Sequence, residues 1–124
     1  MNSHIPLPVN FIEIFGLFND QCTPKVIAQM NDYQFKLVRL PNDFVCHEHT
    51  DTDEAFIVPE GSLVTDFKEG STTLNAGKMV VVPKGCLHRS RIETEVKLLL
   101  VEPVGIVNAG DAQSALTAPI DDWL

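Results

Sequence analysis

The sequence predicts an all-β fold, a small β-sandwich or β-barrel, for most of this chain of 124 residues. Three observations lead to that expectation. From about residue 33 onward the apolar runs are short, several alternate apolar with polar residues, and Gly- or Pro-containing turns separate them. Many short strands joined by such turns are typical of antiparallel sandwiches and barrels. A chain of this length forms one domain with a single core.

Residues 1–32 are expected to precede the barrel as an arm followed by a short helix. Pro6 and Pro8 favour an extended arm over residues 1–9. Asn10 is suited to cap a helix over residues 11–18. Apolar side chains recur there at helical spacing, namely Phe11, Ile14, Phe15 and Phe18.

The barrel is expected to occupy residues 33–102. Its predicted strands cover residues 33–40, 44–49, 54–58, 62–68, 79–82, 88–93 and 95–102. Gly77 and Gly85 lie in the turns between them, where backbone angles closed to other residues are common. Residues 103–124 read as a tail that packs on the barrel or on a partner subunit, because apolar side chains recur in it.

The charge excludes several classes of partner. Nine basic residues against seventeen acidic ones give a formal net charge of −8, which disfavours binding to nucleic acid or to anionic membranes. No apolar run approaches the length of a membrane span, and no secretory signal is visible. The odd set of Cys22, Cys46 and Cys86 fits reduced thiols, so we expect a cytoplasmic protein.

Histidines carry the chemical signal of this sequence. His47 and His49 are two residues apart on a predicted strand, so their side chains should project to the same face, opposite to Cys46. Glu54 opens the next strand, and His88 follows a Pro-x-Gly turn. Three imidazoles and one carboxylate suit a divalent transition metal with open positions for a substrate. A lone histidine is more often structural, but this combination favours a metal site.

The spacing of these residues is also similar to two known motifs. The first motif runs through Pro41, His47, His49, Glu54 and Gly61, and the second through Gly77, Pro83, Gly85 and His88. They resemble the cupin superfamily patterns G-x5-H-x-H-x3-4-E-x6-G and G-x5-P-x-G-x2-H-x3-N. Two positions depart from these patterns, because Pro41 replaces the first glycine and Ile92 the final asparagine.

This resemblance implies a double-stranded β-helix, or jelly-roll, barrel of the small single-domain cupins often labelled mannose-6-phosphate isomerase-like. It implies that the metal ligands are His47, His49, Glu54 and His88. Asp53 is a rival for the carboxylate position, but Glu54 leaves the required six residues before Gly61. Acceptors for the second ring nitrogen of each histidine are expected among Glu48, Asp51 and Asp53.

The pocket beside this metal is expected to be lined by Phe56, Val58, Ile92 and Cys86. Lys36 and Arg39 lie on opposite faces of one predicted strand, so at most one of these cations points inward. The metal is one divalent transition ion per chain, among Fe, Mn, Zn, Ni, Co and Cu.

Three functions follow as expectations. The first is a metal-dependent enzyme acting on a small oxygenated, sugar-like substrate by isomerase or lyase chemistry, with Glu54 or Glu102 as the catalytic base. The second is an Fe(II)-dependent dioxygenase, and the third is a non-enzymatic barrel that binds or senses a small ligand. A homodimer is expected, both by the resemblance and because the apolar segment 11–18 would otherwise be exposed.

Overall fold

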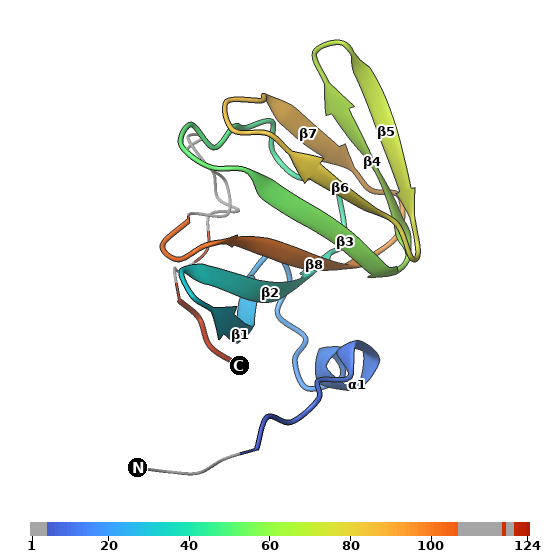
Figure 1. Ribbon diagram of the computed structural model, residues 1–124. Helices are drawn as coiled ribbons and strands as arrows, with labels where there is room; N and C mark the ends of the chain where they lie inside the picture. Colours follow the sequence, from blue (N-terminus) through green and yellow to red (C-terminus); the bar gives the residue numbers. More distant parts are fainter. Residues whose placement is uncertain (1–4, 107–117, 119–120) are drawn as a thin grey trace.

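Two antiparallel β-sheets form the body of the molecule in the computed structural model, which describes residues 5–106, 118 and 121–124. The elements in chain order are α1 (Phe11–Phe15), β1 (Lys25–Met30), β2 (Tyr33–Leu40), β3 (Glu54–Glu60), β4 (Ser62–Phe67), β5 (Gly70–Asn75), β6 (Met79–Val82), β7 (His88–Arg91) and β8 (Val96–Pro103). The larger sheet has the strand order β1-β2-β8-β3-β6 and the smaller one β5-β4-β7 (Figure 1). The all-β prediction is confirmed.

The main core lies between the two sheets. Its buried side chains come from both of them, with Val38, Phe56, Leu98 and Leu100 from the larger sheet and Leu63 and Leu74 from the smaller one. Each strand supplies alternate residues, as expected when one face of a pleated strand turns inward. A tight turn at Gly61 joins β3 to β4 with φ +95°, and a Cβ there would lie 3.1 Å from Cα of Val96. The positive φ and this close approach of two segments both favour glycine at this position.

A second, smaller core covers the outer face of the larger sheet. Phe15 and Phe18 pack there on Leu37 and Leu99, the outward residues of two central strands. Asn10 caps α1 by accepting a hydrogen bond from the Glu13 amide at 3.0 Å. The helix ends at Phe15, earlier than predicted, because Gly16 closes it. No helix among the described residues is long and apolar enough to cross a membrane.

Most of the predicted strands form, and two edge strands were missed. Residues 33–40 and 79–82 form β2 and β6 with the predicted bounds. The sequence analysis missed β5, a polar edge strand of which only Leu74 is buried, and β1, an edge strand placed in the arm. Residues 44–49 were expected to be a strand; they form an extended segment whose one isolated bridge joins His47 to His88.

The described end of the tail pairs with the edge strand β1. The Val26 amide donates to the carbonyl of Asp122 at 2.9 Å, and the Leu124 amide donates to the carbonyl of Val26 at 3.1 Å. Lys25 Nζ lies 2.8 Å from Oδ2 of Asp122. The last residues of the chain therefore lie against the barrel, whereas residues 107–117, 119 and 120 of the expected tail lie outside the described residues.

Candidate metal centre

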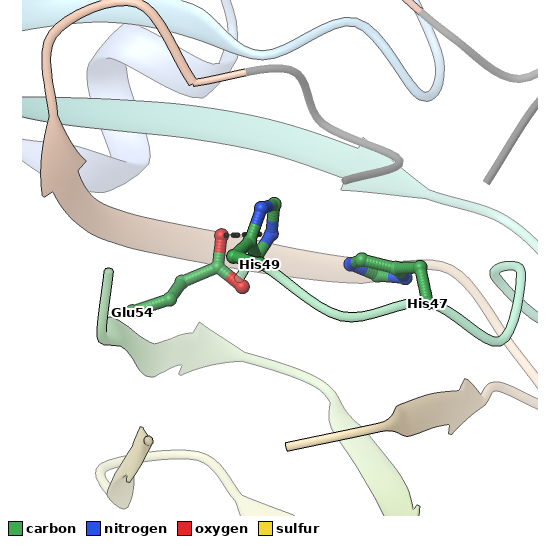
Figure 2. Close-up of side chains that lie close together, drawn as sticks. All are labelled: His47, His49 and Glu54. Carbon is green, nitrogen blue, oxygen red and sulfur yellow. Dashed lines mark ion pairs between the residues drawn. The ribbon is translucent and has the colours of Figure 1, made fainter. Parts of the chain in front are cut away.

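Three predicted ligands come together in one buried group. The side chains of His47, His49 and Glu54 offer nitrogen and oxygen atoms that all lie within 4.8 Å of one another. The three residues are 4%, 8% and 3% exposed. His49 Nε2 lies 3.4 Å from Glu54 Oε2, and Figure 2 shows these two side chains directed at each other, with His47 further along the same segment.

The fourth predicted ligand, His88, lies beside this group. Its Nε2 atom is 3.9 Å from Oε1 of Glu54, and the ring centroids of His47 and His88 are 4.3 Å apart. His88 is 1% exposed. The structure thus brings all four residues implied by the cupin motifs to one place inside the barrel.

Local backbone geometry orients the two histidines of the first motif. Burial alternates along the extended segment, with Cys46 exposed, His47 buried, Glu48 half-buried and His49 buried. The prediction that His47 and His49 share a face is therefore confirmed, although no regular strand forms. Gly85 has φ +71°, as expected for its turn, and its amide donates to the carbonyl of His49 at 2.8 Å.

Backbone carbonyls set the tautomers of two of the imidazoles. Nδ1 of His47 lies 2.8 Å from the Val45 carbonyl oxygen, and Nδ1 of His88 lies 2.8 Å from that of Cys86. A carbonyl only accepts, so each Nδ1 carries the proton and each Nε2 keeps a lone pair for a metal. These acceptors are not the carboxylates expected from the sequence.

Asp53, the rival for the carboxylate position, is exposed to solvent. Its side chain accepts a hydrogen bond from the Lys84 amide at 2.9 Å.

The donor set fits a divalent transition metal. Nε2 of His88 is buried and has no hydrogen-bond partner among the described residues, which is costly for a polar atom unless something binds it. Burial, reinforced by His47 and His49, lowers the pKa of His88 to about 4, so this imidazole is neutral at pH 7. Neutral imidazoles and a buried carboxylate are the ligands that such metals take.

A second buried carboxyl group lies next to Glu54. Glu102 of β8 is 1% exposed, and Lys36 of β2, 3% exposed, places Nζ 3.0 Å from its Oε1. Burial raises the pKa of Glu54, and burial together with Glu54 raises the pKa of Glu102 to about 9, against the opposing effect of Lys36.

The sequence analysis left open whether Lys36 or Arg39 points into the barrel, and the structure shows that it is Lys36. Arg39 faces the other way and bonds the carbonyls of Phe15 and Phe18.

A small apolar cavity opens on two of the candidate ligands, His47 and Glu54. Its volume is about 30 Å³, room for only a few waters. The walls are formed by Cys22, Pro24, Val38, Leu40, Phe44, His47, Glu54, Phe56, Ser90, Leu98 and Leu100.

The expected pocket residues are divided between this cavity and other places. Phe56 lies on the cavity wall, whereas Val58 and Ile92 pack in the main core. Cys86 lines a separate surface groove with Cys46 and Lys84. The sequence analysis did not anticipate that Cys22 and Pro24, in the segment before β1, would line the cavity. No motif or periodic pattern around these two residues indicates that position.

Comparisons with known proteins identify the family of the chain. A model of the Cupin_2 family, described as a cupin domain, matches residues 37–102, more than half of the chain. The chain is 52% identical to a cupin-2 domain containing protein from Shewanella frigidimarina, with a TM-score of 0.74 and coverage of 77% of this chain and 93% of that one. It is 33% identical to protein NMB1881 from Neisseria meningitidis, with a TM-score of 0.71 and coverage of 78% and 99%.

The chain is also similar to one curated protein of unassigned function. The chain is 39% identical over 77 residues to YdbB of Bacillus subtilis, which is described as uncharacterized, covering 61% of this chain and 68% of that protein. The family match spans Glu54 and His88 as well as both histidines of the first motif. The chain therefore belongs to the cupin domain family, and its buried His47, His49 and Glu54 form a group that could hold a metal ion.

Proposed function

We propose that this protein is a metal-dependent enzyme acting on a compact, mostly apolar small molecule, and that oxidation by dioxygen is its reaction. One observation carries the proposal. The cavity that opens on His47 and Glu54 is walled largely by aliphatic and aromatic side chains. A lining of this kind suits an apolar body and leaves orientation to a few polar groups, here His47, Glu54 and Ser90. Because the cavity itself holds only about 30 Å³, a substrate would have to widen it or extend out through its mouth.

A sugar-like substrate fits this cavity less well. Each buried hydroxyl group needs a hydrogen-bond partner, and leaving one without a partner costs about 1–3 kcal/mol. Among the described wall residues, Ser90 is the one hydroxyl-bearing side chain. We therefore place the dioxygenase ahead of the sugar isomerase or lyase that the sequence first suggested.

The isomerase or lyase remains a second candidate because of one feature. Glu54 and Glu102 form a buried pair of carboxyl groups, and the raised pKa of Glu102, about 9, lets it hold a proton at neutral pH. Isomerases and lyases of carbonyl compounds need such a group to move a proton between atoms of the substrate.

The roles of the chain's own residues follow from their positions. The three imidazoles and Glu54 would hold the metal from one side, leaving the cavity side open. Phe56, Leu98 and Leu100 would hold the apolar part of the substrate and exclude water. A bound ferrous ion would supply the one-electron chemistry that dioxygen requires.

Oxygen consumption tests this proposal. The metal-free protein would be loaded with Fe²⁺ without air and mixed with catechols or β-diketones, which carry two close oxygen atoms on an apolar body. We expect compound-dependent oxygen uptake in the native protein and in Arg91→Gln, a change on the exposed face of β7, and none in His49→Ala.

Two other results would contradict it. Isomerisation or elimination of sugar phosphates or uronates without oxygen uptake would favour the second candidate. Saturable binding of a compound without any turnover, with several metals tried, would indicate a non-enzymatic binding or sensor protein.

We also propose that the chain acts as a homodimer with a small molecule, not a nucleic acid, as its ligand. Residues 5–10 run outward from α1 (Figure 1), and Ile5 and Leu7 are 77% and 78% exposed. Phe11 and Ile12 on the helix are exposed as well. Apolar side chains gathered in this way are costly in water and favour contact with a second copy.

A further inference from the structure

A row of hydroxyl groups crosses the inner face of the smaller sheet. Thr65 of β4 pairs with Thr72 of β5 on one side and with Ser90 of β7 on the other. Directly opposite residues of antiparallel strands point to the same face of a sheet, so all three side chains turn inward. The next inward-facing pair on β4 and β5, Leu63 with Leu74, is apolar and belongs to the main core. The hydroxyl row is therefore a polar interruption of an apolar face.

The hydroxyl group of Thr65 is buried and has no hydrogen-bond partner among the described residues. Thr65 is 0% exposed and Ser90 is 5% exposed. Hydroxyl groups on opposite strands often bond each other, but Oγ1 of Thr65 makes no such bond with its described neighbours. A buried hydroxyl group without a partner destabilises a fold, and valine, which has nearly the same shape, would avoid that cost. The cost of threonine here would be offset when a group from outside the chain supplies the missing bond.

Ser90 connects this row to the cavity beside the candidate metal centre. Ser90 lies on the cavity wall, and Thr65 lies next to it on the neighbouring strand. The Cβ atoms of such opposite residues are about 5 Å apart. His88 precedes Ser90 by two residues on the same face of β7, a separation of about 7 Å along the strand. A substrate that widens the cavity past Ser90 would reach Thr65 while its other end faces the candidate ligands.

We propose that Thr65 and Ser90 form a subsite for a hydroxyl or carbonyl oxygen at the end of the substrate remote from the candidate ligands. The inference rests on the proposed function and deepens it, because it adds one polar group to the apolar substrate class. A substrate hydroxyl group can accept a hydrogen bond from one side chain and donate to the other, and a carbonyl oxygen can accept from both. Among apolar compounds, the subsite would select those with an oxygen atom at this position.

Two catechols that differ in one oxygen atom test the subsite. The full chain, loaded with Co²⁺, would be titrated by calorimetry with 4-methylcatechol and with 3,4-dihydroxybenzyl alcohol. In the alcohol, the length of the ring separates the added hydroxyl group from the catechol oxygens, a span similar to that between His88 and Ser90. We expect the native protein to bind the alcohol about tenfold more tightly than 4-methylcatechol. Thr65→Val and Ser90→Ala should lose this preference and keep their affinity for 4-methylcatechol within about threefold.

Two further variants serve as controls, and thermal stability gives a second readout. Thr73→Val removes an exposed hydroxyl group of β5 and should leave the preference unchanged. Thr65→Ser keeps a hydroxyl group at the buried position and should retain most of the preference. In the protein without catechol, Thr65→Val removes a buried hydroxyl group that has no partner among the described residues, so the Tm of this variant should rise by a few degrees.

The outcomes separate this inference from the proposed function. Equal affinity of the native protein for both catechols would overturn the subsite, and so would an undiminished preference in Thr65→Val. A lower Tm of Thr65→Val would also overturn it, because its hydroxyl group would then bond within the folded chain. If Thr65→Val does not fold, Ser90→Ala decides by losing or keeping the preference. These results leave the proposed function standing, because Co²⁺ and 4-methylcatechol still bind. A protein that binds Co²⁺ and neither catechol would lack the proposed substrate cavity, and the subsite would fail with it.

Discussion

His47 and His88 are joined by a reciprocal pair of backbone hydrogen bonds. The amide of each donates to the carbonyl of the other, at 2.9 Å in both directions. This isolated bridge ties the first motif to the second and brings the two rings to 4.3 Å between centroids. The backbone therefore holds these two rings together, although residues 44–49, which carry His47, form no regular strand.

The choice between Glu54 and Asp53 as the carboxylate ligand gives a first prediction. Glu54→Gln replaces a buried carboxylate that faces the imidazoles, so metal affinity should fall by a factor of about 10 or more. Asp53→Asn is the matched control, because Asp53 is exposed and bonds the Lys84 amide. Calorimetric titration of both variants with Co²⁺ checks this; equal losses in the two would contradict the assignment.

Acidity should change the stability of the metal-free protein in a defined direction. The pKa of Glu102 rises from 4.5 to about 9 on folding, so the stability that its proton provides is present at low pH and is lost as pH rises toward 9. The pKa of His88 falls from 6.5 to about 4, which has the opposite effect between those two values.

The two effects oppose each other below pH 6.5, so the decline attributable to Glu102 should appear from pH 6.5 to 9. Urea unfolding across that range measures it. Glu102→Gln should show a clearly flatter dependence, and an equally steep decline in this variant would contradict the assignment.

Removal of metal should destabilise the fold. A ligand that binds only the folded chain stabilises it by about 2.7 kcal/mol at a free concentration of 100 times its Kd. For a domain of this size, that corresponds to a rise in Tm on the order of 10 °C. Thermal unfolding with and without added Co²⁺ checks the prediction, with His49→Ala expected to show little response.

The oligomeric state depends on the N-terminal arm in this account. Ile5→Glu with Leu7→Glu places charges on side chains that are almost fully exposed in the single chain, so the monomer fold should be kept. We expect the dimer mass of the native protein to fall to that of a monomer. Light scattering decides the point, and a native protein that is already monomeric would refute the dimer.

The sequence allowed prediction of most strands and of a cluster of candidate ligands because their signals are local. The run Tyr33–Leu40 is bounded by a turn at Pro41, and the motif histidines and Glu54 lie at fixed spacings. The edge strand β5 could not be found in this way, because Ser71, Thr72 and Thr73 give it no apolar pattern and its partner β4 determines its register.

The pairing of Lys36 with Glu102 lay equally beyond the sequence. These residues belong to strands distant in the chain, and the register of β2 on β8 is what brings them together. The extended segment of His47 and His49 shows the reverse case. Its alternating pattern placed both rings correctly, although few backbone hydrogen bonds join it to neighbouring strands.

Metal content is the most direct test of the central claim. The untagged protein, purified without chelators, would be measured by plasma mass spectrometry beside His49→Ala, with unfolding curves to show that both are folded. The account predicts about one transition metal ion per native chain and almost none in the variant. The absence of metal from the native protein, or equal metal in both, would contradict the assignment of His47, His49, Glu54 and His88 as a metal site.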